Sequence, residues 1–428
     1  MRELLERVER ATPAGRDRAV DGLRALAIGG VVLGHWLVTA LVADSGTLRG
    51  ASPLSALPQL APASWLFQTL SVFFLVGGLV AARGWARSTE RYRVWLGRRL
   101  ARLFGPVVTV VAVWTVAAVT MLASGVSLDV VLALARLVWS PLWFLLVFAA
   151  LTALTPLATK SVSLRTATAP PRQSPAPTTT APTQPALAPT ATAPTRQIPT
   201  PTTTAPTQQA PAPTTSASVR RAPAVTVAVL VVVVALVDVG RFWAGGPGWL
   251  GWVNVVAGWL VPYCLGVSWA GGMPSRRTGW GLLLGGGAAT VALVLAAGYP
   301  ASMVGVPGAA VSNLDPPTPA VVMFGLAQCG AARLLADPLR RALRRPLAWA
   351  AVALVNVHAI TIFLWHQTAM IAVTALGLLT GRVLPGLHTA PESAAWVAAR
   401  LTWLPAFGAV LVACCALAGV RRRRAPTT

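Results

Sequence analysis

An arginine and a histidine lie within the first long apolar stretch of the chain, which runs from Asp21 to Ala43. His35 follows Arg24 by eleven positions. A helix turns by about 100° per residue, so these two side chains lie within about 20° of each other and roughly 16 Å apart along the axis. Ionisable groups are costly inside a bilayer, and two on one helical stripe indicate a functional face. The alternative is an arginine that extends its charge to the interface and a histidine that is satisfied inside a helix bundle.

The segment DGLRALAIGGVVLGHW, at 21–36, has an arginine, ten residues and then a histidine. It resembles the first-helix signature of the acyltransferase-3 family of integral membrane O-acyltransferases. The resemblance implies that His35 is a general base, which takes the proton of an acceptor hydroxyl as that hydroxyl attacks a thioester. A neutral imidazole can accept a proton near neutral pH, and an acyl-histidine intermediate stays open as an alternative. Arg24 would contact the donor or stabilise developing negative charge.

A basic segment, GRRLARLFGP at 97–106, lies between the second and third apolar stretches. Arg99 and Arg102 are one turn apart on a helical face, with Arg98 beside them. Guanidinium groups are permanently charged and bind phosphates in bidentate fashion, although positive charge is also ordinary in a cytoplasmic loop. The family has an arginine pair of RxxR form in this loop, which Arg99 and Arg102 match. The resemblance therefore implies that these arginines recognise acyl-CoA.

Asp238 lies inside a predicted span, in VALVDVGRFW, and Arg241 follows three residues later. Such a pair can neutralise itself, which would be a structural role. It can also bind an acceptor near the outer face or orient His35. Asn254, in the next span, is a similar candidate with a weaker signal. We keep all three of these residues as candidate substrate contacts.

Later motifs add further candidates for substrate contacts. Trp143, in PLWFLLVF, resembles a tryptophan-containing family motif, and the alternative is an interfacial anchor. TIFLWHQ resembles the late YLxH element of the family, which His366 matches with phenylalanine at or near the tyrosine position. His358 lies about 80° around the helix from His366, so the two share no metal-binding edge, and we predict a structural role for His358 and no metal site. Asp315, in SNLDPPTP, either touches the acceptor or caps a turn.

The composition predicts an all-α, polytopic membrane protein. Hydrophobic residues make up 55% of the chain and charged residues 11%, against about 25% charged in a soluble domain. The net charge of +23 follows the positive-inside pattern rather than a nucleic-acid signal, because all basic residues except Arg49, Arg136, Arg241, Arg382 and Arg400 fall on one side. This alternation predicts ten helices in the cell (plasma) membrane with both termini in the cytoplasm. After the first, we expect spans near 64–82, 104–124, 139–158, 223–243, 250–271, 280–298, 318–336, 350–377 and 395–419.

The predicted organisation is a membrane unit divided by an insert. Helices one to four occupy 1–159 and helices five to ten occupy 223–420, with a basic cytoplasmic tail at 421–428. The insert at 160–222 is rich in Pro, Thr and Ala and repeats PTTTAPTQ. Such a composition buries no core, so we expect a disordered cytoplasmic linker that is dispensable for chemistry.

The predicted function is transfer of an acyl group, acetyl in the first instance, from cytosolic acyl-CoA to a hydroxyl of a carbohydrate, glycolipid or cell-envelope acceptor. We expect Arg24 and His35 to face one pocket that a thioester reaches from the cytosol. The alternative is a transporter or flippase that moves an acyl group or polyprenyl-linked sugar without chemistry, which inverted repeats and broken helices would favour. Glycine-interrupted spans such as GLLLGGGAATVALVLAAG keep that alternative open.

Overall fold

The computed structural model describes residues 2–13, 15–44, 47–163 and 217–424, which are almost entirely helical. Ten helical segments in this part of the chain are long and apolar enough to cross a membrane. This result confirms the predicted all-α, polytopic bundle. The ten segments are Arg18–Val38, Pro58–Ala86, Tyr92–Ala123, Leu128–Ala153, Pro223–Phe242, Gly248–Trp269, Arg276–Ala296, Pro319–Ala342, Ala359–Leu378 and Ala394–Ala418.

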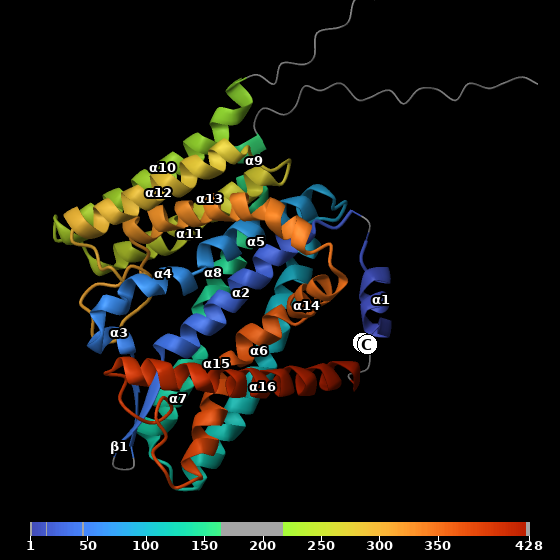
Figure 1. The fold of residues 1–428 in the computed structure, drawn as a ribbon. Helices are drawn as coiled ribbons and strands as arrows, with labels where there is room; N and C mark the ends of the chain where they lie inside the picture. The colour runs from blue at the N-terminus through green and yellow to red at the C-terminus, as the bar shows by residue number, and fades with distance from the viewer. Residues whose placement is uncertain (1, 14, 45–46, 164–216, 425–428) are drawn as a thin grey trace, which may run out of the picture.

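Figure 1 shows how the elements are arranged in space. In order they are α1 (Arg2–Arg10), α2 (Arg18–Val38), β1 (Ala40–Asp44), β2 (Thr47–Ala51), α3 (Pro53–Ala56), η1 (Pro58–Ala63), α4 (Ser64–Phe67), α5 (Leu70–Ala86), α6 (Tyr92–Ala123), α7 (Leu128–Trp139), α8 (Leu142–Ala153), α9 (Thr155–Ser163), α10 (Ala217–Phe242), η2 (Gly248–Leu250), α11 (Gly251–Trp269), α12 (Arg276–Ala296), α13 (Pro319–Ala342), α14 (Pro346–Val357), α15 (Ala359–Leu378) and α16 (Ala394–Arg424).

The helices divide into an inner and an outer set. In α13 and α11, 67% and 61% of the most apolar window is buried, against 11% in α6 and 17% in α10, α12 and α16. Large aliphatic side chains such as Val108, Val116 and Val119 of α6 are exposed. Because the exposed faces of the outer helices are apolar, they are suited to contact lipid, and polar groups are enclosed by the inner helices.

Glycines bring the inner helices into close contact. A Cβ atom at Gly78 of α5 would lie well under 3.0 Å from the carbonyl oxygen of Tyr263 in α11, and one at Gly266 of α11 would meet Leu75 in the same way. Any larger residue would push these backbones apart, which explains the Gly-rich apolar sequence of this pair. The same packing occurs between Gly286 of α12 and α13, and the glycine-rich segment of α12 lies in an unbroken helix.

Several predicted boundaries are wrong. The first helix ends at Val38, and the residues after it form a hairpin in which Ala40 pairs with Ala51. The buried guanidinium of Arg400 donates to the carbonyl oxygens of Trp36 (2.7 Å) and Thr39 (2.7 Å). These bonds satisfy carbonyl groups that a helix end leaves free, which favours termination at this point.

Two other differences affect the site. Helix α6 begins at Tyr92, so the arginines at 98–102 lie in its first turns rather than in a loop. The predicted ninth span is interrupted at His358, which ends α14 and precedes α15. The predicted linker lies mostly outside the described residues, and its ends belong to α9 and α10.

The bundle has two distinguishable ends in Figure 1. Helix α1 lies on the right, and α16 runs toward the same side. The β1–β2 hairpin and helix α3 lie at the left, at the opposite end. Helix α1 and the last turns of α16 therefore lie on the same side of the bundle.

Candidate active site

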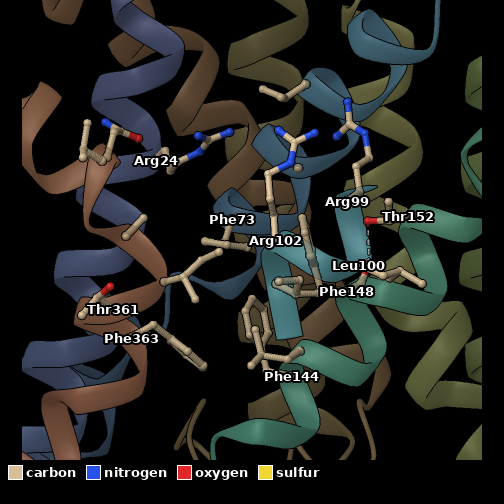
Figure 2. Close-up of a pocket in the computed structure, with 18 residues that line it drawn as sticks. Arg24, Phe73, Arg99, Leu100, Arg102, Phe144, Phe148, Thr152, Thr361 and Phe363 are labelled. Atoms are coloured by element: carbon tan, nitrogen blue, oxygen red, sulfur yellow. Dashed lines mark hydrogen bonds between the residues drawn. The ribbon is translucent and has the colours of Figure 1, made fainter. Parts of the chain in front are cut away.

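A cavity of about 410 Å³, which we call the arginine cavity, lies among α2, α5, α6, α8, α14 and α15. Arg24 of α2 lines it together with Arg99 and Arg102 of α6. Figure 2 shows these three guanidinium groups at the same end of the cavity. Helices α2 and α6 thus line one cavity, and this arrangement brings Arg24 to the RxxR pair.

The three guanidinium groups of this cavity have no carboxylate partner in the part of the chain that the structure describes. Asp21 lies one turn before Arg24 but is held by Arg16, through Nε to Oδ2 (2.6 Å) and Nη2 to Oδ1 (3.0 Å). Arg99 lies over the ring of Trp95 at 4.5 Å. Three positive charges without counter-ions are suited to an anion such as a phosphate.

The deeper part of the arginine cavity is apolar and aromatic. Figure 2 shows Phe73, Phe144, Phe148 and Phe363 below the guanidinium groups. The ring centroids of Phe73 and Phe144 are 4.9 Å apart, and those of Phe144 and Phe363 are 5.3 Å apart. The cavity thus joins a cationic end to an aromatic interior, which fits a ligand with an anionic end and an apolar end.

A second cavity of about 380 Å³, which we call the histidine cavity, is lined by His35 of α2. Its other walls come from the segment Phe67–Leu70, the α7–α8 junction, the loop 304–315 and α15. Its polar lining comes from side chains that can form hydrogen bonds with hydroxyl groups, including Gln68, Thr69, Ser140, Ser312, Asp315 and Gln367.

His35 is held between α2 and α15. Gln367 Nε2 lies 3.2 Å from His35 Nδ1, and His35 Nε2 has no hydrogen-bond partner among the described residues. The ring of His366 lies 5.1 Å from that of His35, and Trp36 Nε1 donates to the carbonyl oxygen of His366 (2.9 Å). His35 therefore has one nitrogen fixed by an amide and one available for chemistry.

His366 is fully buried and lines neither cavity. Its Nδ1 lies 2.6 Å from the carbonyl oxygen of Phe363, so Nδ1 carries a proton and donates it. His366, a predicted site residue, therefore lies beside His35 and does not reach either cavity. His358 lies at the α14–α15 break, consistent with a structural role, and lines neither cavity.

The expectation of one pocket shared by Arg24 and His35 is wrong for this structure. Arg24 lines the arginine cavity and His35 lines the histidine cavity. Helical periodicity places both side chains on one stripe, but it does not predict what packs between them. Phe144 and Phe363 line both cavities and form a wall between them.

Asp238, Arg241 and Asn254 lie away from both cavities. Asp238 Oδ1 accepts from Asn254 Nδ2 (2.9 Å) and pairs with Arg241 Nη1 (3.3 Å), and Oδ2 accepts from the Tyr299 hydroxyl (3.2 Å). Burial raises the pKa of Tyr299, in the loop after α12, to about 12, so its hydroxyl remains a donor. These contacts pair the Asp238 carboxylate within the cluster, as the structural alternative for these residues expects, although Arg241 Nε and Asn254 Oδ1 have no partner among the described residues.

The remaining candidates divide between the cavities and the surface. Trp143 and Asp315 both line the histidine cavity. Arg98 does not line the arginine cavity, because its exposed side chain is turned to an ion pair with Glu90. The expectation that Arg98 joins the donor site with its neighbours thus lacks support from the geometry.

Sequence reasoning missed Gln367 and the two shared phenylalanines. Gln367 follows His366 directly, so the family-like TIFLWHQ motif contained the signal, but the sequence gives no reason to pair its amide with His35. Phe144 and Phe363 look like ordinary core residues. No group of three or more His, Cys, Asp or Glu side chains within the described ranges is arranged to hold a metal ion.

A family model described as an acyltransferase domain, that of the acyltransferase-3 proteins, matches residues 17–419. The match contains both cavities and every helix that lines them. Neither a curated protein nor a solved structure matches the chain. The arginine pair, the first-helix histidine and the ten membrane helices thus occur together within one family domain, and the chain belongs to the acyltransferase-3 family of membrane acyltransferases.

Proposed function

We propose that this protein is an O-acyltransferase that moves an acyl group, acetyl in the first instance, from acyl-CoA to a hydroxyl of a carbohydrate, glycolipid or cell-envelope acceptor. The observation that carries the proposal is the cavity in which Arg24, Arg99 and Arg102 meet without a carboxylate partner in the described chain. Three unpaired guanidinium groups beside an aromatic interior suit a donor that is polyanionic at one end and apolar at the other.

In this proposal the phosphates of CoA bind Arg99 and Arg102. Arg102 is exposed and Arg99 is half-buried, so the pair extends from solvent into the cavity. Arg24, also half-buried, lies on α2 and contacts the donor from the opposite wall. The pantetheine and acyl portions then lie along the phenylalanines, where apolar surface is buried favourably.

His35 acts as the general base. The acceptor oxygen attacks the thioester carbonyl carbon, and its proton passes to His35 Nε2. When the tetrahedral intermediate collapses, the C–S bond breaks and the leaving sulfur takes that proton. The products are the ester and free CoA thiol, and His35 is neutral again.

Gln367 selects the tautomer of His35 in this mechanism. With the amide nitrogen donating to Nδ1, as in the structure, the ring proton lies on Nε2. A half-turn of the amide makes its oxygen accept from Nδ1–H instead, which leaves Nε2 free to accept a proton. The Gln367 oxygen has no other hydrogen-bond partner in the described residues, so this half-turn breaks no bond of that oxygen.

The histidine cavity is the proposed acceptor site. Hydroxyl groups of an acceptor have hydrogen-bonding partners there in Ser140, Ser312 and Asp315, and Trp143 offers an aromatic face. The cavity lies toward the hairpin end of the bundle, since β2 and the loop 304–315 contribute to it. With both termini in the cytoplasm of a plasma-membrane protein, acyl-CoA enters from the cytoplasm and the acceptor enters from the other side.

The test is release of CoA thiol by the full-length protein in lipid nanodiscs. Acetyl-CoA is supplied together with an extract of envelope lipids and glycans, and the acylated product is detected by mass spectrometry. Thiol release that requires the extract, with an equal amount of acylated product, supports the proposal. Binding of CoA without any acyl transfer in such mixtures would instead favour a carrier of acyl groups.

A further inference from the structure

Phe144 of α8 and Phe363 of α15 each line both the arginine cavity and the histidine cavity. Their ring centroids are 5.3 Å apart with the ring planes inclined by 47°, and their exposed fractions are 4% and 8%. Both residues are nearly fully buried between the two cavities. Phe144 and Phe363 therefore form a wall that the two cavities share.

A row of rings connects this barrier to the proposed base. Phe363 lies 5.9 Å from His366, and His366 lies 5.1 Å from His35, measured between ring centroids. The carbonyl oxygen of Phe363 also accepts the Nδ1 proton of His366. Phe363 is thus fixed at its backbone beside the histidine pair and lines both cavities.

The donor meets this barrier in any reaction that uses both cavities. If the CoA phosphates are held by the arginines, the acyl carbon must pass Phe144 and Phe363 to meet an oxygen activated by His35. The two rings have no polar atoms and are held by packing alone, so they can be displaced without breaking a hydrogen bond. A small acyl group requires a small displacement, and each additional methylene requires more.

We propose that Phe144 and Phe363 are specificity-determining residues, which set the size of the acyl group that crosses from the arginine cavity to His35. This inference rests on the proposed function of the arginine cavity as the donor site. It assigns the limit on acyl length to these two phenylalanines, which we call the partition, and not to the arginines. The protein is therefore expected to favour short acyl groups. Removing a ring opens the partition to longer chains.

The test compares acyl-CoA binding and turnover for chains of two, four and eight carbons. Full-length wild-type protein, Phe144→Ala and Phe363→Ala are measured in nanodiscs, with CoA itself as the reference ligand. Each methylene that enters an apolar site favours binding by about four-fold. Either substitution is thus expected to raise the preference for octanoyl-CoA over acetyl-CoA by about ten-fold or more, a ratio that any change in the affinity for CoA itself leaves unaffected.

Phe324→Ala is the matched control. Phe324 is buried to the same degree, with 7% exposed, but it lines neither cavity. This control is expected to keep the wild-type chain-length preference. Phe144→Leu and Phe363→Leu remove less of the core, so they keep the test valid if an alanine variant does not fold, and they shift the preference in the same direction by a smaller factor.

The outcomes separate this proposal from the one on which it rests. CoA binding by every variant with an unchanged chain-length preference would overturn the role of the partition and leave the donor site intact. A wild-type protein that binds no CoA would remove the donor site, and the partition role with it. Altered preference in the two partition variants, but not in Phe324→Ala, is the supporting result.

Discussion

Two regions of the bundle each contain an arginine within a predicted membrane helix, and the two arginines differ in the partners of their side chains. Arg241 is packed with Asp238, Asn254 and Tyr299, and each of its neighbours forms a hydrogen bond within the cluster. Arg24 has no carboxylate partner in the described chain, because Arg16 holds the nearest one, Asp21, and its guanidinium faces a cavity. Placing either charge in a membrane costs free energy. Only the charge of Arg241 is paired with a carboxylate, that of Asp238.

The difference separates a structural charge from a candidate functional one. Buried charges are normally paired, and a self-contained cluster needs no ligand. An unpaired guanidinium beside a cavity has room for a ligand that supplies the missing negative charge. The same distinction separates Arg99 and Arg102 from their neighbour Arg98, whose charge is paired with Glu90.

The largest expected effect comes from His35→Ala. Loss of a general base lowers turnover by about 10²-fold to 10⁴-fold. Because His35 lies in the other cavity, the affinity for CoA should stay within about two-fold of wild type. His358→Ala is the matched control, since this histidine lines neither cavity, and it should retain turnover. Turnover unaffected by His35→Ala would remove the proposed base.

The next effect concerns the donor site. Arg99→Ala with Arg102→Ala should weaken CoA binding by about 10-fold to 100-fold or more, because charge-assisted contacts contribute about 1.5–3 kcal/mol each. Calorimetry with CoA measures the change. Arg98→Ala removes an equal charge from the same turn of α6 and should leave the affinity near that of wild type. Equal losses in both proteins would show that only the overall positive charge matters.

Arg24→Ala tests the comparison of the two arginines directly. Loss of one charge-assisted contact should reduce kcat/KM for acetyl-CoA by about 10-fold. Arg241→Ala removes the same side chain from the closed cluster and should leave donor kinetics unchanged, with a lower Tm. If Arg241→Ala impairs donor use as strongly as Arg24→Ala, the distinction between a structural and a donor-binding arginine is wrong.

Gln367→Leu should lower kcat by about 10-fold with little change in KM, since it frees the His35 ring to adopt either tautomer. Gln367→Glu provides the matched variant, because a carboxylate only accepts and therefore keeps the proton on His35 Nδ1. Glutamate should restore most of the lost kcat if the amide selects the tautomer. If both variants lose kcat equally, the role of Gln367 is to pack α15 against α2.

The smallest expected effect on activity comes from Asp238→Ala. The donors of Asn254, Arg241 and Tyr299 lose their acceptor, which should lower the stability by about 1–3 kcal/mol. Thermal unfolding in detergent measures this as a lower Tm, while turnover per folded molecule should change by less than about two-fold. A large loss of turnover at unchanged Tm would instead indicate that Asp238 contacts the substrate.

The number and approximate positions of the membrane helices followed from the sequence, because a bilayer demands long apolar stretches whatever their neighbours are. The separation of Arg24 and His35 along one stripe followed from helix geometry in the same way. Local rules did not predict the end of α2 at Val38, since that end depends on Arg400, which lies more than 360 residues later. The break at His358 was missed for a similar reason, since the predicted ninth span is continuous in its apolar pattern.

The assignment of roles within the candidate site depended on tertiary structure. Charge and residue type made both Asp238 and Arg24 candidate site residues. Only their neighbours showed that Asp238 is paired within a cluster and that Arg24 faces a cavity. Two phenylalanines with no chemical signal of their own divide the space that helix periodicity had predicted to be shared. Periodicity follows from one helix alone, whereas pairing, burial and the walls of a cavity arise from several helices, so the folded bundle decides them.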